Sequence, residues 1–146
     1  MKNFILNIPM FLAFGCLFFL NSIIVFYHIC VLMQYIPYTL IYGGKIQSLE
    51  EMYIHEVFSL LVNILILSII YVKKKFIIEN KKNSLLNLMV YGLCVIFMFV
   101  SIYNLIAINL VEILIAVPYT FISVVMCWRI NLPDDGSLLF NSELSK

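Results

Sequence analysis

Charged residues are scarce in this chain. Only 12% of its 146 residues are Asp, Glu, Lys or Arg, whereas 64% are apolar. Soluble domains carry about 25% charged and about 45–50% apolar residues, and so few charges could not cover the surface of a water-soluble protein. An intrinsically disordered chain is excluded too, because disorder requires low hydrophobicity and high charge. The composition therefore predicts an integral membrane protein with one domain.

The chain also lacks the motifs that carry common chemistries. His55 and Glu56 begin an H-E-x-x-H pattern, but Ser59 stands where the second histidine is needed. There is no G-x-S-x-G, phosphate-binding glycine loop or G-x-x-x-G motif. The net charge of +1 gives no basic field for nucleic acid. We therefore predict no catalytic residues, no metal site, no cofactor and no nucleic-acid partner. Four cysteines in apolar runs, without a C-x-x-C, are interpreted as packing residues: Cys16, Cys30, Cys94 and Cys127.

Long uncharged segments are abundant instead. A helix needs about 20 residues to cross a hydrocarbon core of about 30 Å, and the longest uncharged runs exceed that length. Ser48 and Glu51 form a capping box that would open a helix at Leu49. The sequence predicts an all-α transmembrane bundle in a domain over 1–130, followed by a polar tail over 131–146. The four predicted spans are 5–33, 52–73, 84–104 and 110–129, with an interfacial segment at 35–45 that is rich in Tyr and Gly.

The first uncharged run also permits a second topology. It is long enough for two minimal spans that meet at Asn21 and Ser22, which would give five spans in total. Four spans with a cytoplasmic N-terminus place eight of the nine basic residues inside, and five spans place seven inside. We therefore favour four spans with both termini, and the tail, in the cytoplasm.

Polar residues near the external face form the candidate functional cluster. On the second span, Glu51, His55, Ser59 and Asn63 recur every four residues, which predicts one stripe that runs toward mid-membrane. One interpretation is a proton or cation path. The other is that Glu51, His55 and Glu56 sit at the water interface, while Ser59 and Asn63 bond a neighbouring helix, through Asn21 for example. The full candidate cluster is His28, Glu51, His55, Glu56, Ser59, Asn63 and Glu112.

The cytoplasmic segment 73–82 carries five lysines between the second and third spans. Such a loop fixes the topology, and it could also bind anionic lipid head groups at about 1 kcal/mol per lysine. The predicted basic loop comprises Lys73, Lys74, Lys75, Lys81 and Lys82.

Two parts of the chain carry a resemblance. Tyr42-Gly43-Gly44-Lys45 followed by Ser48-Leu49-Glu50-Glu51-Met52-Tyr53, and later Val117-Pro118-Tyr119-Thr120 through Cys127-Trp128-Arg129, resemble short uncharacterised bacterial four-span membrane proteins. The resemblance implies the fold and a place in the cell (inner) membrane, and no catalytic residues. Immunity proteins against pore-forming bacteriocins are similar in size and composition alone.

Two functions are consistent with these features. The first is a non-enzymatic accessory or protective factor that acts through helix–helix contacts, with another membrane protein or with itself. The alternative is a small proton- or cation-coupled transporter or channel that uses the external Glu/His cluster.

Overall fold

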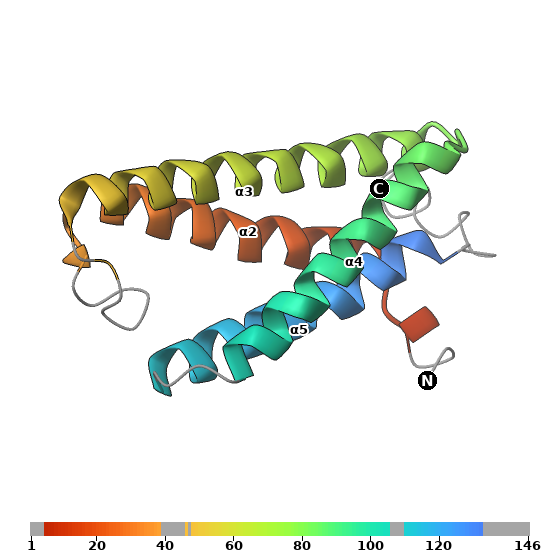
Figure 1. Ribbon diagram of the computed structural model, residues 1–146. Coiled ribbons are helices and arrows are strands. Elements are labelled where there is room, and N and C mark those ends of the chain that lie inside the picture. Colours follow the sequence, from red (N-terminus) through yellow and green to blue (C-terminus); the bar gives the residue numbers. More distant parts are fainter. Residues whose placement is uncertain (1–4, 39–45, 47, 106–109, 133–146) are drawn as a thin grey trace.

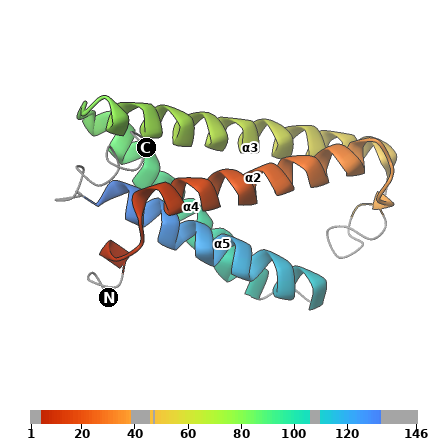
Figure 2. The same ribbon diagram turned by 180° about the vertical axis from the view of Figure 1, so that it is seen from behind.

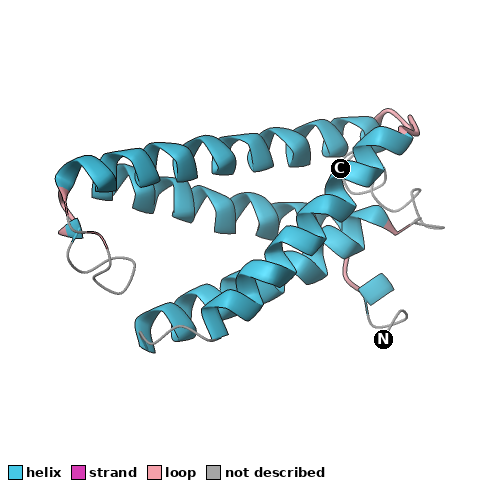
Figure 3. Cartoon of the chain, in the orientation of Figure 1, coloured by secondary structure: helices cyan, strands magenta, loops and turns pink. Residues whose placement is uncertain are grey.

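The structure is a computed structural model, which describes residues 5–38, 46, 48–105 and 110–132, without the side chains of 110–113. Its four long helices are α2 (Met10–Leu32), α3 (Leu49–Ile78), α4 (Ser84–Leu105) and α5 (Leu110–Asn131). The described part of the chain consists of helices and loops, with no strand (Figure 3). All four helices are long and apolar enough to cross a membrane. The prediction of an all-α bundle with four spans is confirmed.

The helix bounds refine the predicted spans. The third and fourth spans agree with α4 and α5 to within two residues. The first span begins at Met10 rather than at residue 5, because Pro9 occupies the N-cap position and the chain turns before it. Asn21 lies in the middle of α2, so the structure has no turn at Asn21 and Ser22, and the five-span alternative is wrong. The interfacial segment 35–45 is described only to residue 38, and the tail only to residue 132.

The second helix is longer than predicted, because α3 runs over 30 residues. It begins at Leu49, where the capping box predicted, and the Ser48 hydroxyl accepts a hydrogen bond from the Glu51 backbone N–H at 3.1 Å. It ends beyond residue 73, so Lys73, Lys74 and Lys75 are helical and do not belong to a loop. An apolar sequence between these lysines and Ile78 lets the helix continue past the charges.

The ends of α2 and α3 close with the same backbone motif. Gln34 and Asn80 follow the C-caps with φ of 60° and 53°, in the left-handed region. The next amides, of Tyr35 and Lys81, bond carbonyls five residues back, at 2.9 Å each. This Schellman arrangement satisfies carbonyls that would otherwise be unpaired at the end of a helix.

The helices form two antiparallel hairpins, α2–α3 and α4–α5, which meet at one end and diverge at the other (Figures 1 and 2). We call the end with Met10, the turn between Ile78 and Ser84, and Asn131 the closed end. The end where α2 gives way to α3, and α4 to α5, is the open end. The closed half holds a core to which all four helices contribute, whereas the small cluster at the open end comes from α2, α3 and the residues between them.

Heptad-like spacing explains which side chains form the core. On α4, Leu86, Val90, Leu93 and Phe97 are buried at alternating steps of four and three residues, which keeps them on one face of the helix. The next residue in this series, Val100, is 40% exposed. Ser101, one turn beyond Phe97, is still buried at 8% exposed, while the α2–α3 hairpin diverges from α4 toward the open end (Figure 1).

The outward faces are apolar, as a lipid environment requires. Large side chains such as Phe19, Phe26, Phe58 and Phe99 are more than 60% exposed. Tyrosines mark both ends of the bundle, with Tyr53 and Tyr103 exposed at the open end and Tyr71 and Tyr91 exposed in the closed half. Such rings favour the two boundaries between lipid and water. The exposed surface thus fits a bilayer bounded by the two ends of the bundle.

Candidate functional site

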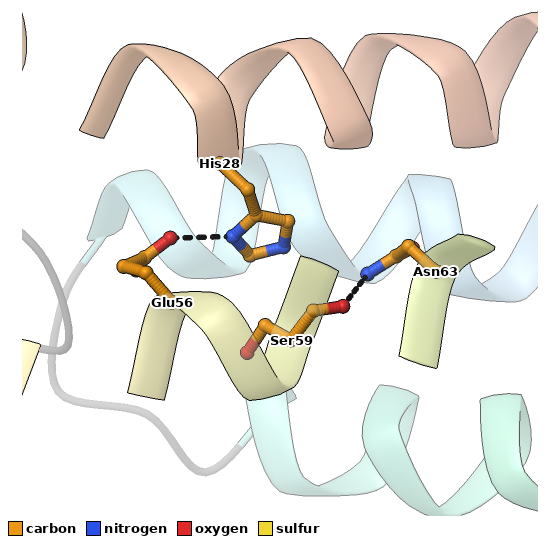
Figure 4. A network of polar contacts seen from close by, with 4 residues as sticks. All are labelled: His28, Glu56, Ser59 and Asn63. Atoms are coloured by element: carbon orange, nitrogen blue, oxygen red, sulfur yellow. Dashed lines mark hydrogen bonds and ion pairs between the residues drawn. The ribbon is translucent and has the colours of Figure 1, made fainter. Parts of the chain in front are cut away.

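The candidate site is a histidine–glutamate pair that joins α2 to α3 near the open end. His28 Nδ1 lies 2.6 Å from Glu56 Oε2, within hydrogen-bonding distance (Figure 4). Glu56 is 0% exposed and His28 is 8% exposed, so water is largely excluded from both. The second carboxylate oxygen, Oε1, is buried and receives no hydrogen bond from the residues that the structure describes.

Helix geometry explains why these two residues meet. Seven residues separate Glu56 from Leu49, which places it roughly 10 Å along α3, and His28 lies about 6 Å before the end of α2. Since the two helices are antiparallel neighbours, these similar distances from the open end bring the two side chains together (Figure 4). A helix of 30 residues is about 45 Å long, against a hydrocarbon core of about 30 Å. If that core is centred on α3, the pair lies just inside its boundary.

The predicted stripe of residues spaced by four is only partly correct. The buried face of α3 alternates steps of four and three, through Met52, Glu56, Ser59, Asn63 and Ile66, with Ser59 and Asn63 half-buried. Steps of four advance by about 40° beyond a full turn each time, so a stripe built from them rotates out of the interface.

The other predicted members of the cluster occupy different positions. His55 is exposed and Glu51 is half-buried, so neither joins the buried pair. Glu112 lies in α5, among the residues whose side chains the structure does not describe. Of the predicted cluster, the structure therefore places His28 against Glu56, and Ser59 and Asn63 on the next turns of α3.

Asn63 and Asn21 use their amide groups differently from the predicted interhelical bond. Asn63 Nδ2 donates to the Ser59 carbonyl within α3 at 2.8 Å (Figure 4). Asn21, which is 0% exposed, donates to the Leu17 carbonyl at 2.8 Å, and its Oδ1 accepts from the Tyr119 hydroxyl at 3.1 Å. Asn21 does link two helices, but its partner lies on α5 rather than on α3.

Polar contacts at the closed end were not anticipated from the sequence. Arg129 is 2% exposed, and its Nε donates to the Ile8 carbonyl at 2.6 Å. Lys73 is also buried and donates from Nζ to Asn87 Oδ1, while Asn131 Nδ2 donates to the Asn87 carbonyl at 2.8 Å. The contact between Lys73 and Asn87 could have been predicted from the short turn between α3 and α4, because this turn places the last residues of one helix beside the first residues of the next.

The lysines of the predicted basic loop therefore have different environments. Lys73 faces the bundle and bonds Asn87. Lys75 and Lys81 lie 3.9 Å and 2.7 Å from the Glu79 carboxylate. The hydrogen bond from Lys81, which is the main cause, lowers the pKa of the Glu79 carboxyl group below its ordinary value. Glu79 thus offsets part of the positive charge that lipid head groups would meet.

The described residues hold no group of three or more His, Cys, Asp and Glu side chains that could bind a metal ion. Cys127 is buried in the core and Cys94 packs against it, in line with the interpretation of these two cysteines as packing residues. Comparison of the chain with protein-family models, with curated proteins and with solved structures finds no match.

Proposed function

We propose that this small membrane protein is a non-enzymatic accessory or protective factor that acts by binding a helix of another membrane protein at its open end. The observation that carries the proposal is the divergence of the two hairpins. Toward the open end the two hairpins separate (Figure 2), and on α4 Val100 is 40% exposed whereas Ser101 beside it remains buried.

Packing in a membrane supports this interpretation. Lipid tails are as apolar as leucine, so helices associate in a bilayer through close packing and hydrogen bonds rather than through burial of apolar area. Four spans could close into one bundle along their whole length, yet here the shared core ends in the closed half. A transmembrane helix seated between the hairpins would gain the packing that the open end lacks.

A photo-crosslinking experiment tests the proposed partner. A benzophenone side chain introduced at Val100 should yield a discrete protein adduct after irradiation of intact membranes. Val95 is the matched control, because it is 48% exposed on the same helix but lies about 140° around it. An adduct of twice the 17.0 kDa chain mass would identify a second copy as the partner. Protein adducts that are equally strong at both positions, or absent from both, would refute the proposal.

Orientation and location form part of the same proposal. The closed end carries Lys73, Lys74, Lys75, Lys81, Lys82 and Arg129. The positive-inside rule then favours a cytoplasmic closed end, with the open end outside. The resemblance to short bacterial four-span proteins supports the inner membrane as the location. A reporter that works only in the cytoplasm should be active when it is fused before Met1. Cleavage of this reporter by an externally added protease would contradict the proposed orientation.

A second candidate, a proton- or cation-coupled transporter, is favoured by the buried pair of His28 and Glu56. Ionisable residues within a membrane are costly and frequently mark ion pathways. Toward the closed end, however, the four helices pack an apolar core around Leu17, Ile66 and Phe97. In liposomes, a transporter would show pH-driven flux that Glu56→Gln abolishes. Absence of flux from the unaltered protein would reject this candidate.

A further inference from the structure

We propose that His28 and Glu56 form a proton-binding site, in which one proton on Glu56 Oε2 is donated to His28 Nδ1. The pair would then be neutral as a carboxylic acid and an imidazole that keeps its own proton on Nε2. This inference goes beyond the proposed partner-binding function and does not depend on it. Its basis is the short contact of 2.6 Å together with the unpartnered Oε1 atom.

The unpartnered oxygen distinguishes between the possible states of the pair. In an ion pair, about half of the carboxylate charge would lie on Oε1, which is buried and to which no described residue donates a hydrogen bond. A buried ion pair offsets its desolvation only when its remaining lone pairs are also satisfied. In the carboxylic acid, Oε1 is an uncharged carbonyl oxygen, and leaving it unpaired costs far less. The geometry therefore favours the neutral acid.

Several titratable residues lie near the pair along the chain or on the neighbouring helices. On α2, the Tyr27 ring lies edge-on to the imidazole, with 5.6 Å between ring centroids. The nearest titratable neighbours on α3 are Glu51, Tyr53 and His55, which are half-buried or exposed. The α4 segment has no charged residue in its sequence. On α5, Tyr119 binds Asn21, Arg129 lies at the closed end, and the Glu112 side chain is not described.

Loss of the shared proton would act on the contact between α2 and α3. Deprotonation leaves a net charge of −1 where Glu56 is 0% exposed, and water must enter to solvate it. The α2–α3 contact at the open end should therefore loosen as the pH rises, while the closed half, held by its apolar core, stays packed. Through this response, the site would make the open end sensitive to the pH on its own side of the membrane.

Infrared spectroscopy of the full chain in lipid vesicles tests the site. The protein at neutral pH should show the C=O band of a buried carboxylic acid. This band should disappear in Glu56→Gln, whose amide can still donate to His28 Nδ1. Glu51→Gln, one turn earlier on α3 and half-buried, is the control and should keep the band.

Two further measurements complete the test. Nitrogen NMR should show a neutral His28 with its proton on Nε2. Amide hydrogen exchange over 24–34 and 49–60 should accelerate with pH relative to exchange over 86–97. This acceleration should occur in the unaltered protein but not in Glu56→Gln. A doubly protonated His28, or absence of the acid band in the unaltered protein, would overturn the proposal. A band that survives in Glu56→Gln would do the same.

Discussion

The hydrogen bond between Asn21 and Tyr119 joins the two hairpins, and Tyr119→Phe removes only its donor. The ring of Tyr119 also packs edge-to-face on Phe97, at 6.1 Å between centroids, and a phenylalanine keeps that contact. Asn21 is fully buried, so the substitution leaves its Oδ1 without the Tyr119 hydroxyl. Its amide retains the bond to the Leu17 carbonyl. The Tyr119 hydroxyl also contacts the Ser123 side chain within α5, so a double-mutant cycle is needed to isolate the interhelical hydrogen bond.

The expected magnitude follows from the membrane environment. Interhelical hydrogen bonds in a membrane protein contribute about 0.6 kcal/mol on average and at most about 1.7 kcal/mol in double-mutant cycles. A cycle of Tyr119→Phe with Asn21→Leu should give a coupling within this range. The cost of Tyr119→Phe alone includes the penalty for leaving the buried Asn21 acceptor unsatisfied. The cycle counts this penalty in the coupling energy, because Asn21→Leu removes the acceptor.

Reversible unfolding in mixed micelles measures each variant, with Tyr91→Phe as the control. Tyr91 is 46% exposed on an outward face, so loss of its hydroxyl should not change the free energy of unfolding appreciably. A coupling near zero would show that Asn21 and Tyr119 are not bonded in the membrane. A coupling above about 2 kcal/mol would show that the two residues do more than share one bond.

Two other predictions concern the ends of α3. Ser48→Ala removes the N-cap acceptor of the Glu51 amide and should lower the free energy of unfolding by about 1 kcal/mol. Ser48→Asn should retain most of the stability of the unaltered protein, because asparagine is also a good N-cap residue. Equal stability of the unaltered protein and both variants would contradict the role of Ser48 as a cap. Glu79→Gln should increase the enrichment of anionic over zwitterionic lipid around the protein, measured with spin-labelled lipids, because Lys75 and Lys81 lose their carboxylate partner. Glu50→Gln, at the other end of α3, is the control. Because the folded-state pKa of Glu79 is lowered, its ion pairs contribute at and above the ordinary carboxyl pKa and are lost as the pH falls through the lowered value. Acidification should therefore reproduce the effect of Glu79→Gln, and identical lipid profiles under all conditions would refute this role for Glu79.

Local signals in the sequence were sufficient for most of the fold. The uncharged runs predicted the four helices, and the capping box located the first residue of α3 because Ser48 and Glu51 interact within one turn. The end of α3 was misplaced, since the lysines at 73–75 were interpreted as the edge of the membrane. Charge limits how deep a residue can sit in lipid, but it does not end a helix. The Schellman turn at Asn80, followed by the Asn83 side chain capping α4, ends the hairpin instead.

By itself, the sequence determined that the chain has the composition of a membrane protein, that it forms four apolar helices, and which polar residues lie within them. These properties depend on hydropathy and on contacts within a few residues. Only the tertiary structure decided which polar groups meet. Glu56 pairs with His28, which lies 28 residues earlier, and Asn21 bonds Tyr119, 98 residues later. The opening between the hairpins also depends on how two helix pairs pack against each other. Because lipid imposes no cost on an uncovered apolar face, the hydropathy pattern is the same for a closed and an open bundle.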